Sequence, residues 1–263
     1  MMLQKEQTKF NVDYTSMFKT MLETKGTISK CYSIFHNYSI NNQFLAYWQL
    51  SMRGLGLSPI ATYKKWESLG RQVQKGQKAM FLWQPRTKVW YTEDENKEQV
   101  KHVQIIGFDM PKKWFAMSQT EGKDIDIENI KIKNFNFDKI YKKFGIKIIP
   151  FEKLNGNVQG YAITSEKKLA INPIAQHPEM TILHEVAHIV LKHCDVKYSR
   201  DLKELEAEAT AYIIGSVLGL DDEQLSDSRG YIQNWFTENE IPEQQAQNIM
   251  SAADKILKAG LEK

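Results

Sequence analysis

Two histidines four residues apart, His184 and His188, enclose a glutamate, Glu185, in the run His-Glu-Val-Ala-His. Residues four apart share one face of a helix, so both imidazoles can reach one ion. A catalytic Zn²⁺ takes three protein ligands and keeps one position for water. Glu185 is offset by one residue, so its carboxylate can take a proton from that water as a general base. The pattern predicts a metallopeptidase site with one Zn²⁺ per chain, although two histidines satisfied by hydrogen bonds in a core would give the same letters.

The third ligand is expected from the next helix, which carries Glu204, Glu206 and Glu208. Glu208 is surrounded by alanines, and small residues let two helices approach closely enough to share a metal. We therefore predict Glu208 as the third ligand. The alternative is a solvated acidic cluster in the first turn, favoured by the helix dipole, which we expect for Glu206. His193 lies five residues after His188, off the shared face, and is expected to be a cationic or hydrogen-bonding group near the helix C-terminus.

The elements that position these residues form an α+β arrangement in the second half of the chain. A helix at Phe137–Phe144 is expected before a strand at Ile146–Phe151 and a hairpin of Gly160–Thr164 and Leu169–Asn172. Strand Leu169–Asn172 could hold a peptide substrate as an added strand or could be purely structural. Four helices should follow, at Pro178–His193, Leu202–Leu218, Asp222–Trp235 and Pro242–Ala259.

The first half should contain helices and strands of its own. The expected helices are Val12–Glu23, Asn42–Met52 and Thr62–Gly70, and the expected strands are Ala79–Trp83, Lys88–Tyr91, Val100–Phe108 and Trp114–Met117. A polar stretch without a core run separates the halves. We therefore predict two domains, residues 1–122 and 137–263, joined by a linker at 123–136.

Composition excludes several classes of protein. The chain has 263 residues, 42% hydrophobic and 25% charged, which is ordinary for a globular protein. Its two cysteines give no disulfide framework and no cysteine-rich zinc ribbon. The first ten residues lack the apolar core of a secretory signal. Polar residues interrupt the longest uncharged stretch, so no membrane span is expected. We expect a soluble, cytoplasmic protein.

Positive charge is concentrated in the first half. Residues 1–120 carry a net charge of +8 and residues 121–263 a net charge of −5. Residues 51–90 contain eight Lys and Arg against one acid, interleaved with aromatic residues. Cations contact phosphates and aromatic rings stack on unpaired bases, so this segment is a candidate binding site for single-stranded DNA. The alternative is a solvated basic face with its tryptophans in the core. The candidate DNA-binding residues are Arg53, Lys64, Lys65, Trp66, Arg71, Lys75 and Lys78.

Two segments of the second half resemble known metallopeptidases. The run 181–193 (TILHEVAHIVLKH), followed by 204–214 (ELEAEATAYII), is similar to the gluzincin-type domain of ArdC antirestriction proteins and to the ImmA/IrrE metallopeptidases. In those families two histidines and a glutamate that precedes a small residue bind zinc, and the glutamate between the histidines is the base. The resemblance implies that His184, His188 and Glu208 bind zinc and that Glu185 is the base.

The first half resembles the single-stranded-DNA-binding domain of ArdC proteins. The similar segments, in the family's order, are 38–50 (YSINNQFLAYWQL), 61–78 (ATYKKWESLGRQVQKGQK), 81–85 (FLWQP) and 115–122 (FAMSQTEG). The resemblance implies an antirestriction protein of a mobile element that binds single-stranded DNA and carries a peptidase site. Two alternatives stay open. One is a regulatory peptidase that cleaves a repressor, and the other is a DNA-binding module whose zinc is not catalytic.

Overall fold

The structure is a computed structural model that describes residues 12–94, 98–126, 132, 134–152 and 158–261. The fold is α+β, as predicted. The chain divides into two compact units. Unit 1 comprises residues 1–13 and 49–126, and unit 2 comprises residues 14–48 and 127–263. No helix among the described residues is long and apolar enough to cross a membrane.

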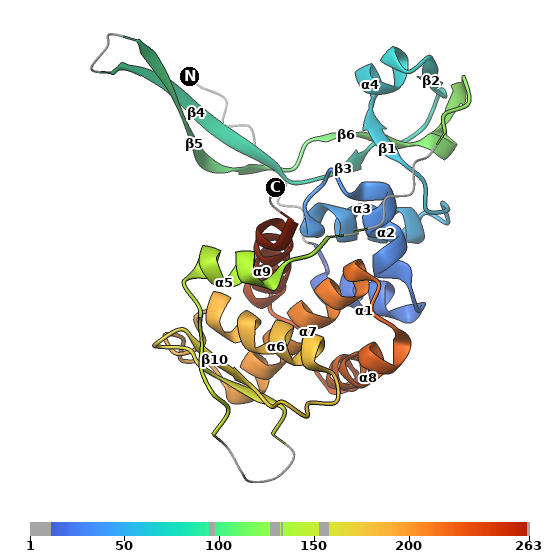
Figure 1. Cartoon of the computed structure of the whole chain (residues 1–263). Helices are drawn as coiled ribbons and strands as arrows, with labels where there is room; N and C mark the ends of the chain where they lie inside the picture. The colour runs from blue at the N-terminus through green and yellow to red at the C-terminus, as the bar shows by residue number, and fades with distance from the viewer. Residues whose placement is uncertain (1–11, 95–97, 127–131, 133, 153–157, 262–263) are drawn as a thin grey trace. The chain divides into compact units, whose positions relative to one another are not determined.

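Unit 1 is built from short strands around one helix (Figure 1). In its three-stranded sheet, β6 (Lys112–Ala116) lies between β1 (Ile60–Thr62) and β3 (Met80–Phe81) and is antiparallel to both. Strand β2 (Arg71–Val73) pairs with β7 (Thr120–Gly122), which follows a 3₁₀ turn at Met117–Gln119. Helix α4 (Tyr63–Ser68) starts where the Thr62 side chain accepts a hydrogen bond from the Lys65 N–H. The predicted helix at Thr62–Gly70 is therefore confirmed, with shorter bounds.

A long hairpin extends from this unit. Strand β4 (Gln84–Glu93) and strand β5 (Gln99–Asp109) pair with each other over ten positions, and the register shifts between Arg86 and Thr87. Every residue of β4 is exposed. The exposed large apolar side chains on the two strands are Val89, Trp90, Tyr91, Val100, Val103, Ile105, Ile106 and Phe108.

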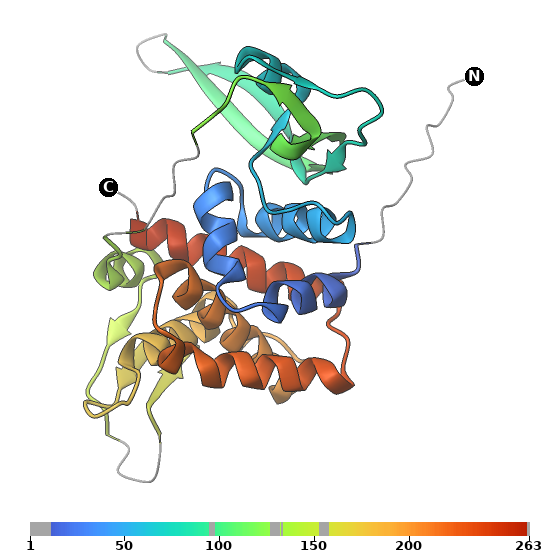
Figure 2. The same cartoon turned by 90° about the vertical axis from the view of Figure 1, so that its right-hand side faces the viewer.

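Unit 2 is organised around one buried helix, α7 (Arg200–Leu218). Its residues are buried almost continuously from Leu205 to Val217. Helices α6 (Pro178–Val190), α8 (Asp222–Glu238) and α9 (Glu243–Leu261) pack against it (Figure 1, Figure 2). The four helices predicted for this part of the chain are confirmed, with ends that differ by up to three residues. Helix α5 (Phe137–Phe144), confirmed as predicted, packs against α9 and ends at Gly145 in the left-handed conformation.

A small sheet flanks α6. Strand β10 (Lys168–Ile171) is central, with β8 (Lys147–Ile148) parallel on one side and β9 (Gly160–Ile163) antiparallel on the other. The position of β10 excludes the suggestion that it receives a substrate strand, because both of its edges are already paired. Strand β9 is an edge strand, and it packs against α6.

Helices from the N-terminal part of the chain complete unit 2. Helices α1 (Tyr14–Glu23) and α2 (Thr27–Phe35) pack against α8 and α7, respectively, and α3 (Ile40–Met52) begins in unit 2 and ends in unit 1. The Phe18 ring lies 5.7 Å from Phe44 and 5.9 Å from Phe236. By packing, residues 14–48 belong to unit 2, whereas the sequence prediction placed them in one domain with residues 49–122. Residues 127–131 and 133 of the predicted linker lie outside the described residues.

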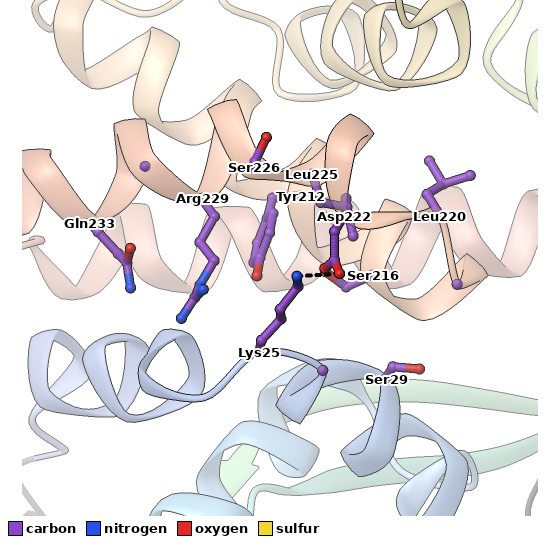
Figure 3. Close-up of a pocket in the computed structure, with 13 residues that line it drawn as sticks. Lys25, Ser29, Tyr212, Ser216, Leu220, Asp222, Leu225, Ser226, Arg229 and Gln233 are labelled. Carbon is purple, nitrogen blue, oxygen red and sulfur yellow. Dashed lines mark ion pairs between the residues drawn. The ribbon is translucent and has the colours of Figure 1, made fainter.

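Side chains from α8 fasten the turn between α1 and α2. Arg229 donates hydrogen bonds to the carbonyl oxygens of Leu22, at 2.6 Å, and Glu23, at 3.1 Å, and so caps the C-terminal end of α1. Lys25 forms an ion pair with Asp222 (Figure 3). These residues border a cavity of about 480 Å³ between the turn and the helices α7 and α8. Through these contacts α1 and α2 belong to unit 2, although they are far from α8 in the sequence.

Candidate metal centre

Helix α6 presents the histidines because its two faces differ. Pro178 stands in its first turn, where the missing N–H costs no hydrogen bond. One face buries apolar side chains, namely Met180, Leu183, Val186, Ala187 and Ile189. His184 and His188 point away from most of this core, and their side chains are 21% and 15% exposed. The sequence prediction that these two imidazoles share a face is confirmed.

Three ligand atoms converge between α6 and α7. Nε2 of His184 and Nε2 of His188 are 3.1 Å apart. Oε2 of Glu204 lies 3.4 Å from the former and 3.5 Å from the latter. Ligands about 2.0–2.1 Å from a tetrahedral ion are themselves about 3.3–3.4 Å apart. The three atoms therefore form one face of a tetrahedron of the size that a small divalent cation requires.

Glu208, predicted as the third ligand, occupies a different position. Its Oε2 lies 2.7 Å from Nδ1 of His184, the ring nitrogen on the other side from Glu204. Glu208 also hydrogen-bonds to Ser228 of α8. One turn of α7 separates the two glutamates, and it is Glu204 that lies near both Nε2 atoms, so the assignment of Glu208 as a ligand stays a prediction that the structure does not support. Glu208 instead orients the His184 ring from behind.

The carboxylates and the imidazoles shift each other's ionisation. Burial opposes a positive charge on His184, but hydrogen bonds to Glu204 and Glu208 outweigh it and raise the His184 pKa to about 10. Hydrogen bonds to His184 and His188 hold the pKa of Glu204 well below its usual range. For Glu208, burial favours the neutral acid, yet the hydrogen bond to His184 leaves the pKa lowered. The centre thus holds its two glutamates ionised.

Glu185 has the opposite electrostatic environment. Burial raises its pKa, and the neighbouring histidines only partly offset this effect. The backbone N–H of Ala162, in β9, donates a hydrogen bond to its carboxylate. A carboxylate with a raised pKa is a better proton acceptor than an ordinary one. Strand β9 therefore positions a basic carboxylate beside the three ligand atoms.

A cavity opens beside the centre. Its volume is about 410 Å³, and its walls come from the segment before β9, the start of α6, and α8. The lining includes Gly160, Thr181, His184, Glu185, Glu208 and Asp227. A Cβ at Gly160 would lie 2.7 Å from the Thr181 methyl group, so only glycine lets β9 approach α6 this closely. The cavity therefore lies at the start of the edge strand β9.

The structure contradicts the sequence expectation for Glu206 and agrees with the one for His193, which is a hydrogen-bonding group just beyond the C-terminal end of α6. Glu206 is fully buried and is not part of a solvated acidic cluster. His193 is 5% exposed, and its Nδ1 lies 2.7 Å from Nδ1 of His188. On an unbroken helix, a residue five positions after His188 would lie off the face that carries His184 and His188. That assumption excluded His193 from the centre. The chain turns back after Val190 and returns His193 to the centre.

The candidate DNA-binding residues divide into two groups. The Trp66 side chain is 2% exposed, and its Nε1 donates to the Phe115 carbonyl at 2.9 Å, so the prediction that it stacks on bases was wrong. Arg53 donates to the carbonyls of Lys78 and Ala79, and Arg71 donates to four oxygen atoms of residues 120–123. These two guanidinium groups brace unit 1. Lys64, Lys65, Lys75 and Lys78 are exposed, and so is Arg53 despite its hydrogen bonds.

Comparison with known proteins matches both parts of the chain. Residues 8–128 match the family described as the N-terminal domain of anti-restriction factor ArdC. A Bacillus anthracis protein described as uncharacterized, pXO2-81, is 25% identical over 94% of this chain. The match covers 49% of that protein, so the chain spans about half the length of this relative.

Solved structures show the same fold. The metal-free crystal structure of the antirestriction ArdC protein from the R388 plasmid is similar with a TM-score of 0.51 and 18% identity, over 94% of each chain. The Mn(II)-bound structure of that protein is similar with a TM-score of 0.54 and 17% identity, over 96% of this chain and 99% of the other. Residues 8–128 therefore match the ArdC N-terminal domain, and the chain shares the fold of the R388 ArdC protein over almost its whole length.

Proposed function

We propose that this chain is an antirestriction protein that binds single-stranded DNA through unit 1 and hydrolyses peptide bonds at a divalent-metal centre in unit 2. One observation supports the metal centre. Nε2 of His184, Nε2 of His188 and Oε2 of Glu204 lie within 4.8 Å of one another. The antirestriction role is supported by the ArdC family match and the fold.

The donor set fits a divalent cation. Two imidazoles, which release any second proton when they bind a metal, and one carboxylate are ligands that Zn²⁺ and Mn²⁺ both accept. The Mn(II)-bound R388 structure supports a divalent ion in a protein of this fold, and we propose Zn²⁺ as the ion that supports catalysis. When bound, the ion lowers the pKa of a water molecule and polarises a carbonyl group.

The side chains around the ligands have separable tasks. Glu185 accepts the proton of the attacking water and returns it to the leaving amine, as its raised pKa allows. Glu208 holds the His184 ring so that Nε2 faces the ligand cluster. Strand β9 offers an edge along which an extended peptide can lie, in the cavity beside Glu185.

For unit 1, the supporting observation is a set of exposed lysines. Lys64 and Lys65 lie on α4, and Lys75 and Lys78 lie between β2 and β3. Tyr63 is 44% exposed and adjoins this set. Lysines can track a phosphate backbone and an exposed ring can stack on a base without reading sequence.

One experiment separates binding of metal from catalysis. Purified chain is loaded with Zn²⁺, and hydrolysis of casein and of the chain itself is followed for the wild type and for Glu185→Gln. We expect the variant to keep the metal and to lose activity by at least about 100-fold, the low end for a general base. An active variant would refute the role of Glu185. A wild type that binds metal tightly without hydrolysing either substrate would favour a non-catalytic centre.

A further inference from the structure

A buried chain of hydrogen bonds runs away from the ligand cluster. Nδ1 of His188 lies 2.7 Å from Nδ1 of His193, and Nε2 of His193 lies 3.0 Å from Oε2 of Glu206. Glu206 also accepts hydrogen bonds from the Tyr198 hydroxyl and, at 3.0 Å, from the Asn248 amide. A carboxylate that is fully withdrawn from water is costly unless donors surround it, and here three side chains donate to it.

The end of α6 places His193 in this chain. The N–H of Lys192 bonds to the carbonyl of Ile189, and the N–H of His193 bonds to the carbonyl of His188. This pair of bonds is the Schellman arrangement, in which one residue adopts the left-handed conformation. That residue is Lys192, with φ of 56°. The reversal turns His193 back against the turn of α6 that carries His188.

The donors that surround Glu206 favour one direction for the hydrogen bonds between the two histidines and Glu206. Glu206 already accepts hydrogen bonds from Tyr198 and Asn248, and its environment is completed when Nε2 of His193 donates a third. In this arrangement Nδ1 of His193 is the acceptor, and His188 donates to it from Nδ1. A proton on Nδ1 leaves the lone pair on Nε2 of His188 free, and Nε2 is the atom in the ligand cluster.

We propose that His193 and Glu206 are positioning residues that fix the His188 tautomer and strengthen its donation to the metal. The inference rests on the proposed metal centre, but no contact of His193 or Glu206 with a substrate is involved. It assigns a function to two buried ionisable groups that the hydrolytic site does not use directly. Each of the two histidine ligands then has its own support, Glu208 for His184 and the His193–Glu206 pair for His188.

Metal affinity tests this assignment. Zn²⁺ and Mn²⁺ are titrated against a chromophoric chelator for the wild type, His193→Ala, His193→Gln and Glu206→Gln. We expect His193→Ala and Glu206→Gln to bind about 10- to 100-fold more weakly, as is usual when the partner of a ligand is removed. His193→Gln should recover most of the loss, since its amide oxygen can accept from His188 while its amide N–H donates to Glu206. His36→Gln, which changes a half-buried histidine of α2's C-terminal end, is the matched control and should bind as the wild type does.

Two further measurements separate positioning from damage. Thermal unfolding of the metal-free proteins reports structural loss independently of the metal. Nitrogen-15 NMR of the zinc-loaded wild type should show protons on Nδ1 of His188 and Nε2 of His193. Wild-type affinity in His193→Ala, equal losses in the Ala and Gln variants, or a proton on Nδ1 of His193 would each overturn the proposal. A wild type that binds neither metal would remove the proposed function and this inference together, whereas a binding wild type with unaffected variants would remove only the inference.

Discussion

Glu204 and Glu208 contact opposite edges of the same imidazole. Oε2 of Glu204 lies 3.4 Å from Nε2 of His184, and Oε2 of Glu208 lies 2.7 Å from its Nδ1. One ring nitrogen therefore faces the ligand cluster while the other is held from behind. The two glutamates lie on adjacent turns of α7 and have the same side chain, yet one contacts the ligand nitrogen of His184 and the other contacts the opposite ring nitrogen.

Substitution of the two glutamates should show this difference. Glu204→Gln removes a charged ligand, so we expect zinc binding to become too weak to measure in the presence of a competing chelator. Glu208→Gln removes only the support of His184, and affinity should fall by about 10- to 100-fold. Glu179→Gln, at an exposed position in the first turn of α6, serves as the control. If the Glu208 variant lost the metal and the Glu204 variant kept it, the sequence-based ligand assignment would be restored.

The sequence was sufficient for the local part of this centre but not for the part that depends on packing. The spacing of His184 and His188 on an apolar helix was sufficient, because a helix fixes which residues share a face. The choice between Glu204 and Glu208 could not be made in the same way. Glu204 and Glu208 also share a face of α7. Which of them lies near the histidines depends on the point along α7 at which α6 crosses it.

Burial limited the prediction for unit 1 for a similar reason. An aromatic residue among lysines has the composition of a base-stacking surface, but Trp66 belongs to the core beneath α4. Nothing in the local pattern distinguishes the two cases. The same applies to Glu206, whose neighbours in sequence are acidic but whose neighbours in space are His193, Tyr198 and Asn248.

The exposed lysines of unit 1 should carry the electrostatic part of DNA binding. Replacing Lys64, Lys65, Lys75 and Lys78 with Gln is expected to weaken binding of a labelled oligo-dT. The slope of log affinity against log salt should also fall by about 0.7 for each phosphate that the variant no longer neutralises. The matched control replaces four exposed lysines of unit 2, Lys142, Lys143, Lys147 and Lys255. Equal effects of the two sets would point to nonspecific attraction and not to a surface on unit 1.

The left-handed residue that ends α6 stores conformational strain. The left-handed conformation destabilises a non-glycine residue by about 1–2 kcal/mol. Replacement by glycine removes this strain, but it also increases the conformational entropy of the unfolded chain, which offsets part of the gain in stability. We expect Lys192→Gly to raise the free energy of unfolding by about 0.5–1 kcal/mol, measured by urea denaturation, with metal affinity unchanged. Lys167→Gly, at the other left-handed lysine, should act in the same direction. A loss of stability in the Lys192 variant would contradict the turn described for His193.

The two thiols should differ sharply in reactivity. Cys31 is fully buried, and burial raises the pKa of its thiol far above the usual range, so it has almost no thiolate at neutral pH. Cys194 is exposed. We expect a thiol-specific chromogenic disulfide to titrate one cysteine in the folded protein and two in denaturant, and to find no fast thiol in Cys194→Ser. Two fast thiols in the native chain would show that α2 is not packed as described.

The N-terminal helices should be part of the same cooperative unit as the metal centre. Phe18 of α1 is buried against Phe44 and Phe236, and Phe18→Ala is expected to cost about 3–5 kcal/mol. Zinc that binds only the folded state raises the melting temperature of the unit that contains the metal centre. The zinc-sensitive transition in a melting curve is therefore the unfolding of unit 2. We therefore expect Phe18→Ala to lower the zinc-sensitive transition. The boundary predicted from sequence expects the opposite, because it places Phe18 in the DNA-binding domain. If Phe18→Ala lowered only the melting temperature of a zinc-insensitive transition, the boundary predicted from sequence would be supported. The packing of α1 against α8 would then be contradicted.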